Sequence, residues 1–224
     1  MANRFRPQTT LFLVNSVDGR VVSHDSDDLD PDKSWKKDPK IAAISQPFFE
    51  FAKTQEVTTL TYGTILEKLG LNTRQGTPID LGVNLVVVDE KQALNLKAVR
   101  YLAQNTNQCY FVCPSTHPAV SAKLSSKIHL IPYKKLNLKS ILRTLKKDAK
   151  IKTLTLQSYT PLNAQWLAQS LIDHLSVIVS PLLVGLDGTP SLIDYDLPRV
   201  KPLRFISATP FGLGFVNLRY DVIN

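Results

Sequence analysis

The sequence has little cysteine and no long apolar run. Cys109 and Cys113 are its two cysteines among 224 residues, and they lie four positions apart in an apolar stretch. Two positions on one face of the same strand rarely meet disulfide geometry, and a cysteine pair without further ligands nearby does not indicate a metal site. We therefore expect two buried thiols, as in a protein of the reducing cytosol.

No segment approaches the roughly 20 consecutive apolar residues that a membrane-spanning helix needs. The first seven residues also lack the apolar core of a secretory signal. We expect a cytoplasmic protein with no membrane partner.

The sequence also lacks the short motifs of several well-known catalytic chemistries. It contains no HExxH, GxSxG, Walker loop or GxGxxG pattern. Its four histidines show no metal-ligand spacing: His24, His117, His129 and His174. We expect no metal, a structural role for His129, and a surface position for His174 in preference to a role as a base.

Positive charge is concentrated in one stretch. The net charge is +8, and ten of the 27 lysines and arginines lie between Lys123 and Lys152 beside a single acid, Asp148. Apolar residues from Leu138 to Ala149 follow helical spacing, which places the lysines on the outer face of a helix. No aromatic residues interleave with them to stack bases. The pattern favours a solvated helix face over a nucleic-acid partner, with polyanion binding as a weaker alternative.

Strand patterns alternate with helix patterns over most of the chain. We expect strands at Thr9–Asn15, Val57–Tyr62, Val83–Asp89, Cys109–Cys113, Ile128–Tyr133, Thr153–Gln157 and His174–Ser180. We expect helices at Ile41–Lys53, Ile65–Leu69, Leu94–Gln104, Leu138–Lys150 and from a cap at Asn163 to Leu171. Two final strands, Leu203–Ala208 and Gly214–Val222, form an antiparallel pair. This order predicts one α/β domain over residues 1–224, with a mostly parallel central sheet, helices on both faces and a C-terminal antiparallel hairpin.

Ligands of such sheets bind beyond the carboxyl ends of the strands. The residues directly after strands are therefore the candidate site: Asn15 to Asp18, Gly63-Thr64, Asp89 to Lys91, and Gln157 to Thr160. An acid at Asp89 would suit a ribose hydroxyl, whereas Lys91 would suit a 2′-phosphate.

The order of several short elements resembles the pyrimidine reductases of riboflavin biosynthesis. The elements are Arg6-Pro7, Ser16-Val17-Asp18-Gly19, Gly63-Thr64, Leu71-Asn72-Thr73-Arg74, Val86-Val87-Val88-Asp89, Leu171-Ile172-Asp173 and Pro181-Leu182-Leu183-Val184-Gly185. The resemblance covers almost the whole chain. It implies a dihydrofolate-reductase-like fold that binds NADPH and forms a homodimer.

The resemblance also implies roles for individual residues. Asp18 and Gln157 would be catalytic, holding the substrate by hydrogen bonds; Ser16, Lys53, Leu71 and Arg74 would bind it, with Arg74 on an anionic group. The cofactor would be bound by Val14, Asn15, Trp35, Gly63, Thr64, Asp89, Ser158, Tyr159 and Thr160. Simpler roles stay open: Asp18-Gly19 as a tight turn, Trp35 as a lid over apolar surface, and Arg74 as a solvated residue.

The sequence departs from the family pattern in three places. The glycine-rich turn is replaced by Gln157 to Pro161, where side chains would crowd a pyrophosphate and the proline lacks an N–H. Gln157 also stands where many members carry glutamate. Lys53 is the one residue able to replace a substrate-holding arginine.

These observations lead to one main hypothesis and two alternatives. The main hypothesis is an NADPH-dependent reductase that transfers hydride to a pyrimidine-ribose-phosphate or a related small molecule. The first alternative is a degenerate family member that binds a ligand or partner without catalysis. The second is dihydrofolate-reductase-type activity, for which Glu50 is the available acid on the candidate helix.

Overall fold

The computed structural model describes residues 5–21, 39–43, 58–75, 82–185, 190–194 and 196–224. The chain divides into two compact units. Unit 1 comprises Met1–Gln8 and Glu56–Leu154, and unit 2 comprises Thr9–Gln55 and Thr155–Asn224. Each unit is described by itself, and the prediction of a single domain stays a prediction.

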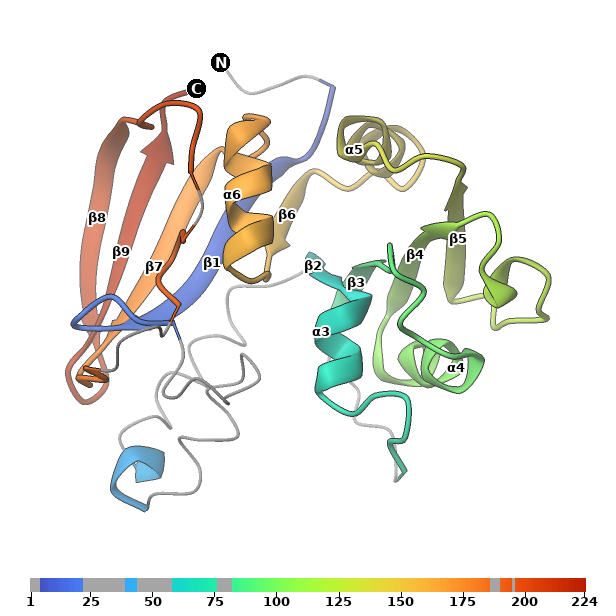
Figure 1. Ribbon diagram of the computed structural model, residues 1–224, viewed down its shortest axis with the longest axis horizontal. Helices are drawn as coiled ribbons and strands as arrows, with labels where there is room; N and C mark the ends of the chain where they lie inside the picture. Colours follow the sequence, from blue (N-terminus) through green and yellow to red (C-terminus); the bar gives the residue numbers. More distant parts are fainter. Residues whose placement is uncertain (1–4, 22–38, 44–57, 76–81, 186–189, 195) are drawn as a thin grey trace. The chain divides into compact units, whose positions relative to one another are not determined.

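The described residues of unit 1 form four parallel strands in the order β5-β4-β3-β2 (Figure 1). Their bounds are β2 Thr58–Tyr62, β3 Asn84–Val88, β4 Gln108–Pro114 and β5 Ile128–Tyr133. All five residues of β2 and four of the five in β3 are buried. Continuous burial of this kind requires cover on both faces of the sheet.

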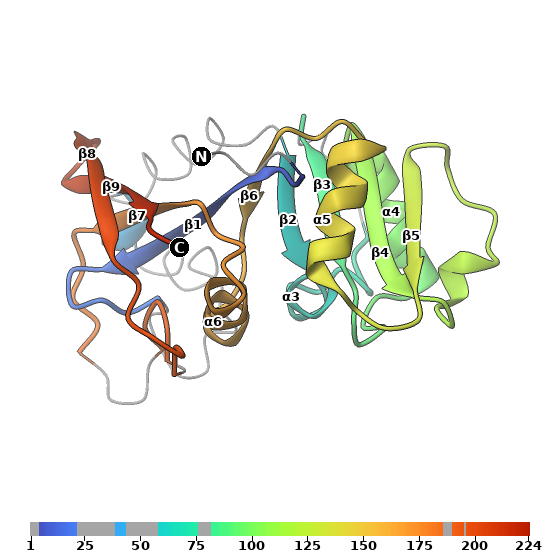
Figure 2. The same ribbon diagram turned by 90° about the horizontal axis from the view of Figure 1, so that it is seen from above.

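Helices supply that cover. Figure 2 shows α4 and α5 on opposite faces of the strands of unit 1. The helices of this unit are α3 Gly63–Lys68, α4 Leu96–Asn105, the 3₁₀ helix η1 Pro118–Val120 and α5 Leu138–Lys147. Asn95 caps α4 and Asn137 caps α5, each by accepting a backbone N–H three residues later. Within the described ranges no helix is long and apolar enough to cross a membrane.

Helix α5 carries the basic stretch as the sequence predicts. Leu138, Ile141, Leu142 and Leu145 are buried on its inner side. The charged side chains at 139, 143 and 147 are exposed on its outer side. The spacing of the apolar residues therefore determined which face of α5 meets the sheet.

In unit 2, the part of the chain that the structure describes forms five strands in the order β6-β1-β7-β9-β8, with β6 beginning at the boundary between the units. Their bounds are β1 Gln8–Ser16, β6 Thr153–Leu156, β7 His174–Ser180, β8 Leu203–Phe211 and β9 Phe215–Val222. Strands β1 and β7 are parallel, with Ser16 opposite Ser180, while β9 is antiparallel to both β7 and β8. The expected mostly parallel α/β fold with a C-terminal antiparallel hairpin is confirmed.

Helix α6 of unit 2, Thr160–Ala168, corrects one prediction. It begins at Thr160 after an extended Tyr159, with Pro161 in its first turn, a position that proline tolerates well. The predicted cap, Asn163, lies inside the helix. Its side chain accepts from the Ser158 hydroxyl and donates to the Leu192 carbonyl, so it joins two loops instead of starting a helix.

His129 and His174, the two histidines for which the sequence predicted a position or role, both contact neighbouring side chains. His129 contacts Gln108 through Nε2 and stacks on Tyr110. His174 contacts Asp221 through Nδ1 at 2.7 Å. Arg204, which also hydrogen-bonds Asp221, and then His174 lower the pKa of the Asp221 carboxyl.

The two cysteines generate a prediction about reactivity. Cys109 and Cys113 are both free and buried on β4, and burial raises their pKa values to about 12 and about 11, respectively. We expect neither thiol to react with an aromatic disulfide reagent at pH 8 in the folded protein, because the thiolate is the reactive form. Both should react in denaturant, and fast labelling of the folded protein would contradict the burial.

Candidate active site

The turn after β1 is tied to the segment after β7 by one carboxylate. Asp18 Oδ1 accepts from the Ser16 hydroxyl at 2.5 Å and from the Val184 N–H at 3.2 Å, and its Oδ2 accepts from the Gly185 N–H at 2.8 Å. Two sequence elements more than 160 positions apart, Ser-Val-Asp-Gly and Pro-Leu-Leu-Val-Gly, therefore form one structure.

These donors set the charge state of Asp18. The Ser16 hydroxyl, followed by the Gly185 and Val184 amides, lowers the pKa of Asp18 from 3.8 to about 2. The carboxylate is ionised at neutral pH and accepts hydrogen bonds without donating a proton. The alternative that Asp18 organises a tight turn has direct geometric support, while contact with a substrate stays a prediction.

Residues 190–192 connect this turn to the start of α6. Val21 N–H donates to the Pro190 carbonyl at 2.9 Å, and Arg20 forms an isolated antiparallel bridge with Ser191. The Thr160 hydroxyl donates to the Ser191 carbonyl at 2.9 Å. Because Thr160 is 4% exposed and turned toward Ser191, its side chain does not project from the end of the helix.

Asn15 supplies an unusual acceptor near the end of β1. Its side-chain Oδ1 is buried, yet no described residue donates a hydrogen bond to it. Its backbone carbonyl accepts from the Ser180 hydroxyl at 3.0 Å, which holds β1 against β7. Buried polar atoms of native proteins nearly always have a partner, so this oxygen suits a donor supplied by a ligand.

In unit 1 the predicted residues Gly63 and Asp89 meet at the ends of adjacent strands. A Cβ added at Gly63 would lie 2.2 Å from Asp89 Oδ1 and 2.6 Å from its Cγ. Gly63 is therefore explained by the close approach of a buried carboxylate. Whether it also approaches cofactor phosphates stays a prediction, as does the role of the half-buried Thr64 beside it.

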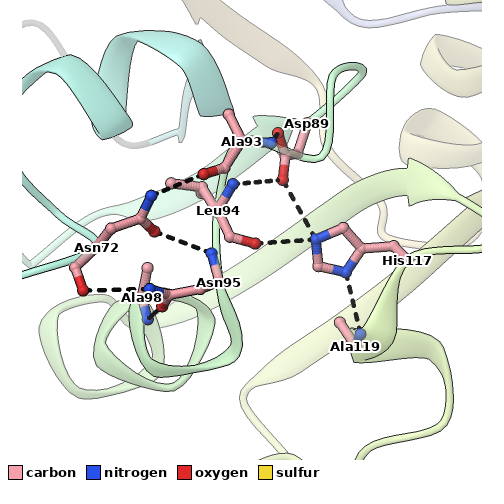
Figure 3. A network of polar contacts seen from close by, with 8 residues as sticks. All are labelled: Asn72, Asp89, Ala93, Leu94, Asn95, Ala98, His117 and Ala119. Carbon is pink, nitrogen blue, oxygen red and sulfur yellow. Dashed lines mark hydrogen bonds and ion pairs between the residues drawn. The ribbon is translucent and has the colours of Figure 1, made fainter.

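Asp89 itself faces into unit 1. Its carboxylate is buried and accepts from the Ala93 N–H at 2.8 Å and the Leu94 N–H at 3.0 Å (Figure 3). His117 Nε2 lies 3.4 Å from Asp89 Oδ2 and 3.0 Å from the Leu94 carbonyl. Because Ala119 N–H donates to His117 Nδ1, the ring proton lies on Nε2 and points at this pair of acceptors.

The turn that contains Leu71 and Arg74 joins the same network through Asn72. The Asn72 amide donates to the Ala93 carbonyl and accepts from the Asn95 N–H (Figure 3). Leu71 is 6% exposed and belongs to the apolar core, a position that favours packing over contact with a substrate. The exposed Arg74 has no side-chain hydrogen bond or ion pair within the described part of the chain.

The predicted residues thus form two groups. Ser16, Asp18, Ser158 and Thr160 belong to the hydrogen-bonded loops of unit 2, with Val14, Gln157 and Tyr159 half-buried on neighbouring segments. Gly63, Leu71 and Asp89 belong to unit 1. Trp35, Glu50 and Lys53 lie outside the described residues.

Sequence analysis missed Asn72 and His117. The signal for His117 was available, because it directly precedes a proline and therefore occupies the capping position of a short helix. Nothing local marks Asn72, whose partners lie more than 20 positions away. Among the described residues, no group of three His, Cys, Asp or Glu side chains could hold a metal ion.

Together, the parallel strands, the antiparallel hairpin and the loops joined at the ends of β1 and β7 define an α/β protein of dihydrofolate-reductase-like architecture. The family model of the RibD C-terminal domain matches residues 7–216, so the chain belongs to this family.

Solved structures of similar fold come from riboflavin biosynthesis. RibD of Acinetobacter baumannii is 17% identical with a TM-score of 0.70, over 99% of this chain and 59% of that chain. The Saccharomyces cerevisiae riboflavin biosynthesis reductase Rib7 is 15% identical with a TM-score of 0.64, over 100% of this chain and 93% of that chain. No curated protein sequence matches.

A third similar structure is the Thermotoga maritima diaminohydroxyphosphoribosylaminopyrimidine deaminase/5-amino-6-(5-phosphoribosylamino)uracil reductase. It is 16% identical with a TM-score of 0.65, over 97% of this chain and 57% of that chain. The chain thus spans somewhat more than half the length of the two bacterial proteins.

The Asp18 geometry predicts an unusual titration. We expect carbon-detected NMR to give a pKa of about 2 for Asp18, and Ser16→Ala to raise it toward the ordinary value, since the Ser16 hydroxyl is the largest contributor. The stabilisation from this carboxylate is present above pH 3.8 and is lost as the pH falls through about 2. Ser140→Ala on α5 is the control, and an ordinary Asp18 pKa in the wild type would contradict the geometry.

The contact between Gly63 and Asp89 predicts a costly substitution. We expect Gly63→Ala to lower the free energy of unfolding by about 1–3 kcal/mol, because the new methyl group overlaps a carboxylate fixed by hydrogen bonds. The measurement is chemical denaturation, with Thr64→Ala as the neighbouring control. Equal stability of Gly63→Ala and wild type would show that the close approach is absent.

Proposed function

We propose that the chain is an NADPH-dependent reductase of the riboflavin-pyrimidine type. It would transfer hydride from NADPH to 5-amino-6-(5-phosphoribosylamino)uracil, or to a related small molecule such as another pyrimidine carrying a ribose phosphate. Membership of the RibD C-terminal domain family over residues 7–216 is the observation that carries this proposal. The similarity in fold to a riboflavin biosynthesis reductase and to a bifunctional deaminase/reductase supports it.

The residues of unit 2 fit the nicotinamide end of the cofactor. The buried Asn15 Oδ1, which lacks a donor among the described residues, matches the amide N–H groups of a carboxamide. NADPH, when bound, supplies the hydride. Asn15 would orient the ring, and Asp18, already bonded to the segment after β7, would keep the neighbouring turn in one conformation.

The start of α6 fits a phosphate group. No side chain caps this helix, and Leu162 N–H already donates to the Tyr159 carbonyl, so the N–H of Thr160 is the first-turn donor that an anion could use. The Thr160 side chain turns away toward Ser191, which reduces the crowding expected from the loss of the glycine-rich turn. Pro161 contributes no N–H, and the half-buried Tyr159 stays as the bulky neighbour.

Asp89 has a consequence for cofactor preference. Because its carboxylate is committed to Ala93 and Leu94, the exposed charged groups of that turn are Glu90 and Lys91. Recognition of a 2′-phosphate would fall to Lys91, and recognition of a ribose hydroxyl would fall to Glu90 instead of Asp89.

Asn15→Leu tests the assigned cofactor contact through two opposite effects. We expect NADPH affinity to fall about tenfold, because one hydrogen bond is lost. We expect the ligand-free protein to become more stable by about 1 kcal/mol, because a buried acceptor without a partner is removed. Calorimetry and thermal unfolding measure the two effects, and a loss of both affinity and stability would indicate a merely structural role.

The alternative, a degenerate member without catalysis, is favoured by the residues that replace the glycine-rich turn. Calorimetry with NADPH and NADH decides between the two, followed by NADPH oxidation with the pyrimidine substrate. We expect the wild type to bind NADPH with micromolar affinity. No binding by the wild type and by Tyr159→Phe, together with binding by Tyr159→Gly, would show that the aromatic ring closes the site and would support the alternative.

A further inference from the structure

The outer face of α5 carries positive charge without a compensating acid. Lys139, Arg143 and Lys147 are exposed and follow one another at four-residue spacing, which places them in one row along the helix. None of the three forms an ion pair with another described residue. Because like charges at this spacing repel each other, the row is a surface that a bound anion would stabilise.

The positive surface continues past the end of α5. Lys150 and Lys152 follow the helix and are both exposed. Lys150 has a φ of 58°, which lies in the left-handed region that favours glycine. The next N–H, that of Ile151, donates to the Leu145 carbonyl at 3.1 Å and closes the helix. The chain therefore places a lysine where glycine would be less strained.

No aromatic residue interleaves with these basic residues in the sequence, but the fold brings two rings together in the same unit. Tyr110 on β4 lies directly opposite His129 on β5 in the strand register. The two rings are stacked, with centroids 4.9 Å apart and an angle of 21° between their planes. His129 is exposed and Tyr110 is half-buried, so the pair is accessible from solvent.

The alternation of the strands shows which face of the sheet the two rings occupy. Cys109, Phe111 and Ile128, which flank them in sequence, belong to the apolar core formed with α4. Successive side chains of a strand point to opposite faces, so Tyr110 and His129 project from the face that carries α5. Figures 1 and 2 both place α5 over the middle strands of unit 1 and away from the edge strand β5.

The stacked rings and the last basic residues of α5 lie toward the same end of unit 1. Figure 2 shows that α5 runs opposite to the strands, so its last turn lies toward the strand starts. Tyr110 and His129 are near the starts of β4 and β5. Gly63 and Lys91, considered above for the cofactor, instead follow the carboxyl ends of β2 and β3. This surface is therefore separate from the proposed cofactor contacts of unit 1.

We propose that this basic aromatic surface, formed by Tyr110, His129, Lys147, Lys150 and Lys152, binds single-stranded RNA. The lysines would contact backbone phosphates. The exposed His129 ring, resting on Tyr110, would stack on an unpaired base. RNA presents such bases in its loops and at its ends, whereas a duplex keeps its bases stacked on one another. An anionic membrane surface would need the charge alone, so the ring pair favours RNA.

The inference rests on side-chain exposure, strand register and charge, and it is independent of the proposed reductase activity. A protein that oxidises NADPH and does not bind RNA would overturn this surface and leave the function intact. A protein that binds RNA and does not bind NADPH would do the reverse.

Fluorescence anisotropy of a labelled oligouridylate with the full chain tests the charged part of the surface. We expect binding at low salt that weakens as salt rises, with a log–log slope of about −2, as roughly three neutralised phosphates predict. Lys147→Glu combined with Lys150→Glu should raise the dissociation constant at least about tenfold, because two phosphate contacts become repulsive. No binding by the wild type at low salt would overturn the proposal.

The matched control makes the same change of charge on the opposite face of unit 1. Lys97→Glu combined with Arg100→Glu alters two exposed residues of α4, and we expect this variant to bind the oligouridylate as tightly as wild type. An equal loss of affinity in the two double variants would show that only net charge matters, and it would overturn the assigned surface.

His129→Ala tests the aromatic part of the surface. We expect the dissociation constant for oligouridylate to rise about tenfold, because stacking on one base is lost. We also expect an RNA duplex of the same length to bind more weakly than the single strand. Unchanged affinity of His129→Ala, equal binding of the duplex, or displacement of the oligouridylate by excess NADPH would each overturn the proposal.

A cross-linking experiment on the wild type covers the case in which a variant fails to fold. Oligouridylate containing 4-thiouridine is irradiated with the full chain, and mass spectrometry of the digested complex identifies the modified residues. We expect adducts at Tyr110 or His129. Adducts confined to unit 2, or to the residues around Gly63 and Lys91, would overturn the proposed surface.

Discussion

The hydrogen bonds of the Asp18 carboxylate hold together the part of the molecule that the proposed function needs. Parallel strands β1 and β7 place Ser16 and Ser180 side by side, and Val17 N–H donates to the Leu182 carbonyl in the segments that follow them. Asp18 adds a second link by accepting from the Ser16 hydroxyl and from two amides after β7. Hydrogen bonds to an ionised acceptor are stronger than neutral ones, so this small cluster gives the end of the sheet a defined shape beside Asn15 and α6.

A second carboxylate, Asp89, organises unit 1 by the same chemistry in a different setting. It is fully buried, and it fixes the loop that leads into α4 by accepting two consecutive amides. His117 and Asn72 extend that network to the neighbouring turns. The two acids that follow β1 and β3 thus both serve as acceptors for backbone amides, although one is exposed and the other is inaccessible to solvent.

Much of this fold could be predicted from sequence because its strands are short, apolar and separated by helices of clear periodicity. The limits of β5 and β7 agree with prediction to the residue, since turn residues bound both runs. The predicted start of α6 was wrong because Asn163 has a side chain typical of a helix cap. The residue at the cap position is Tyr159, which is extended and makes no capping hydrogen bond through its side chain, so its residue type did not indicate a helix start. The inward turn of Asp89 could not be predicted, because the loop amides that it accepts are placed by the fold and not by local spacing.

The order of the units along the chain has a consequence for how the protein is made. Most of unit 1 is one continuous stretch, whereas unit 2 combines the beginning of the chain with its end. During synthesis, the strands of unit 1 are made one after another and can pair promptly. Strand β1 cannot pair with β7 until more than 150 further residues have been made. Contacts of such long separation form slowly. The carboxylate of Asp18 therefore gains its amides only after unit 1 has been synthesised, because Val184 and Gly185 follow that unit in the sequence.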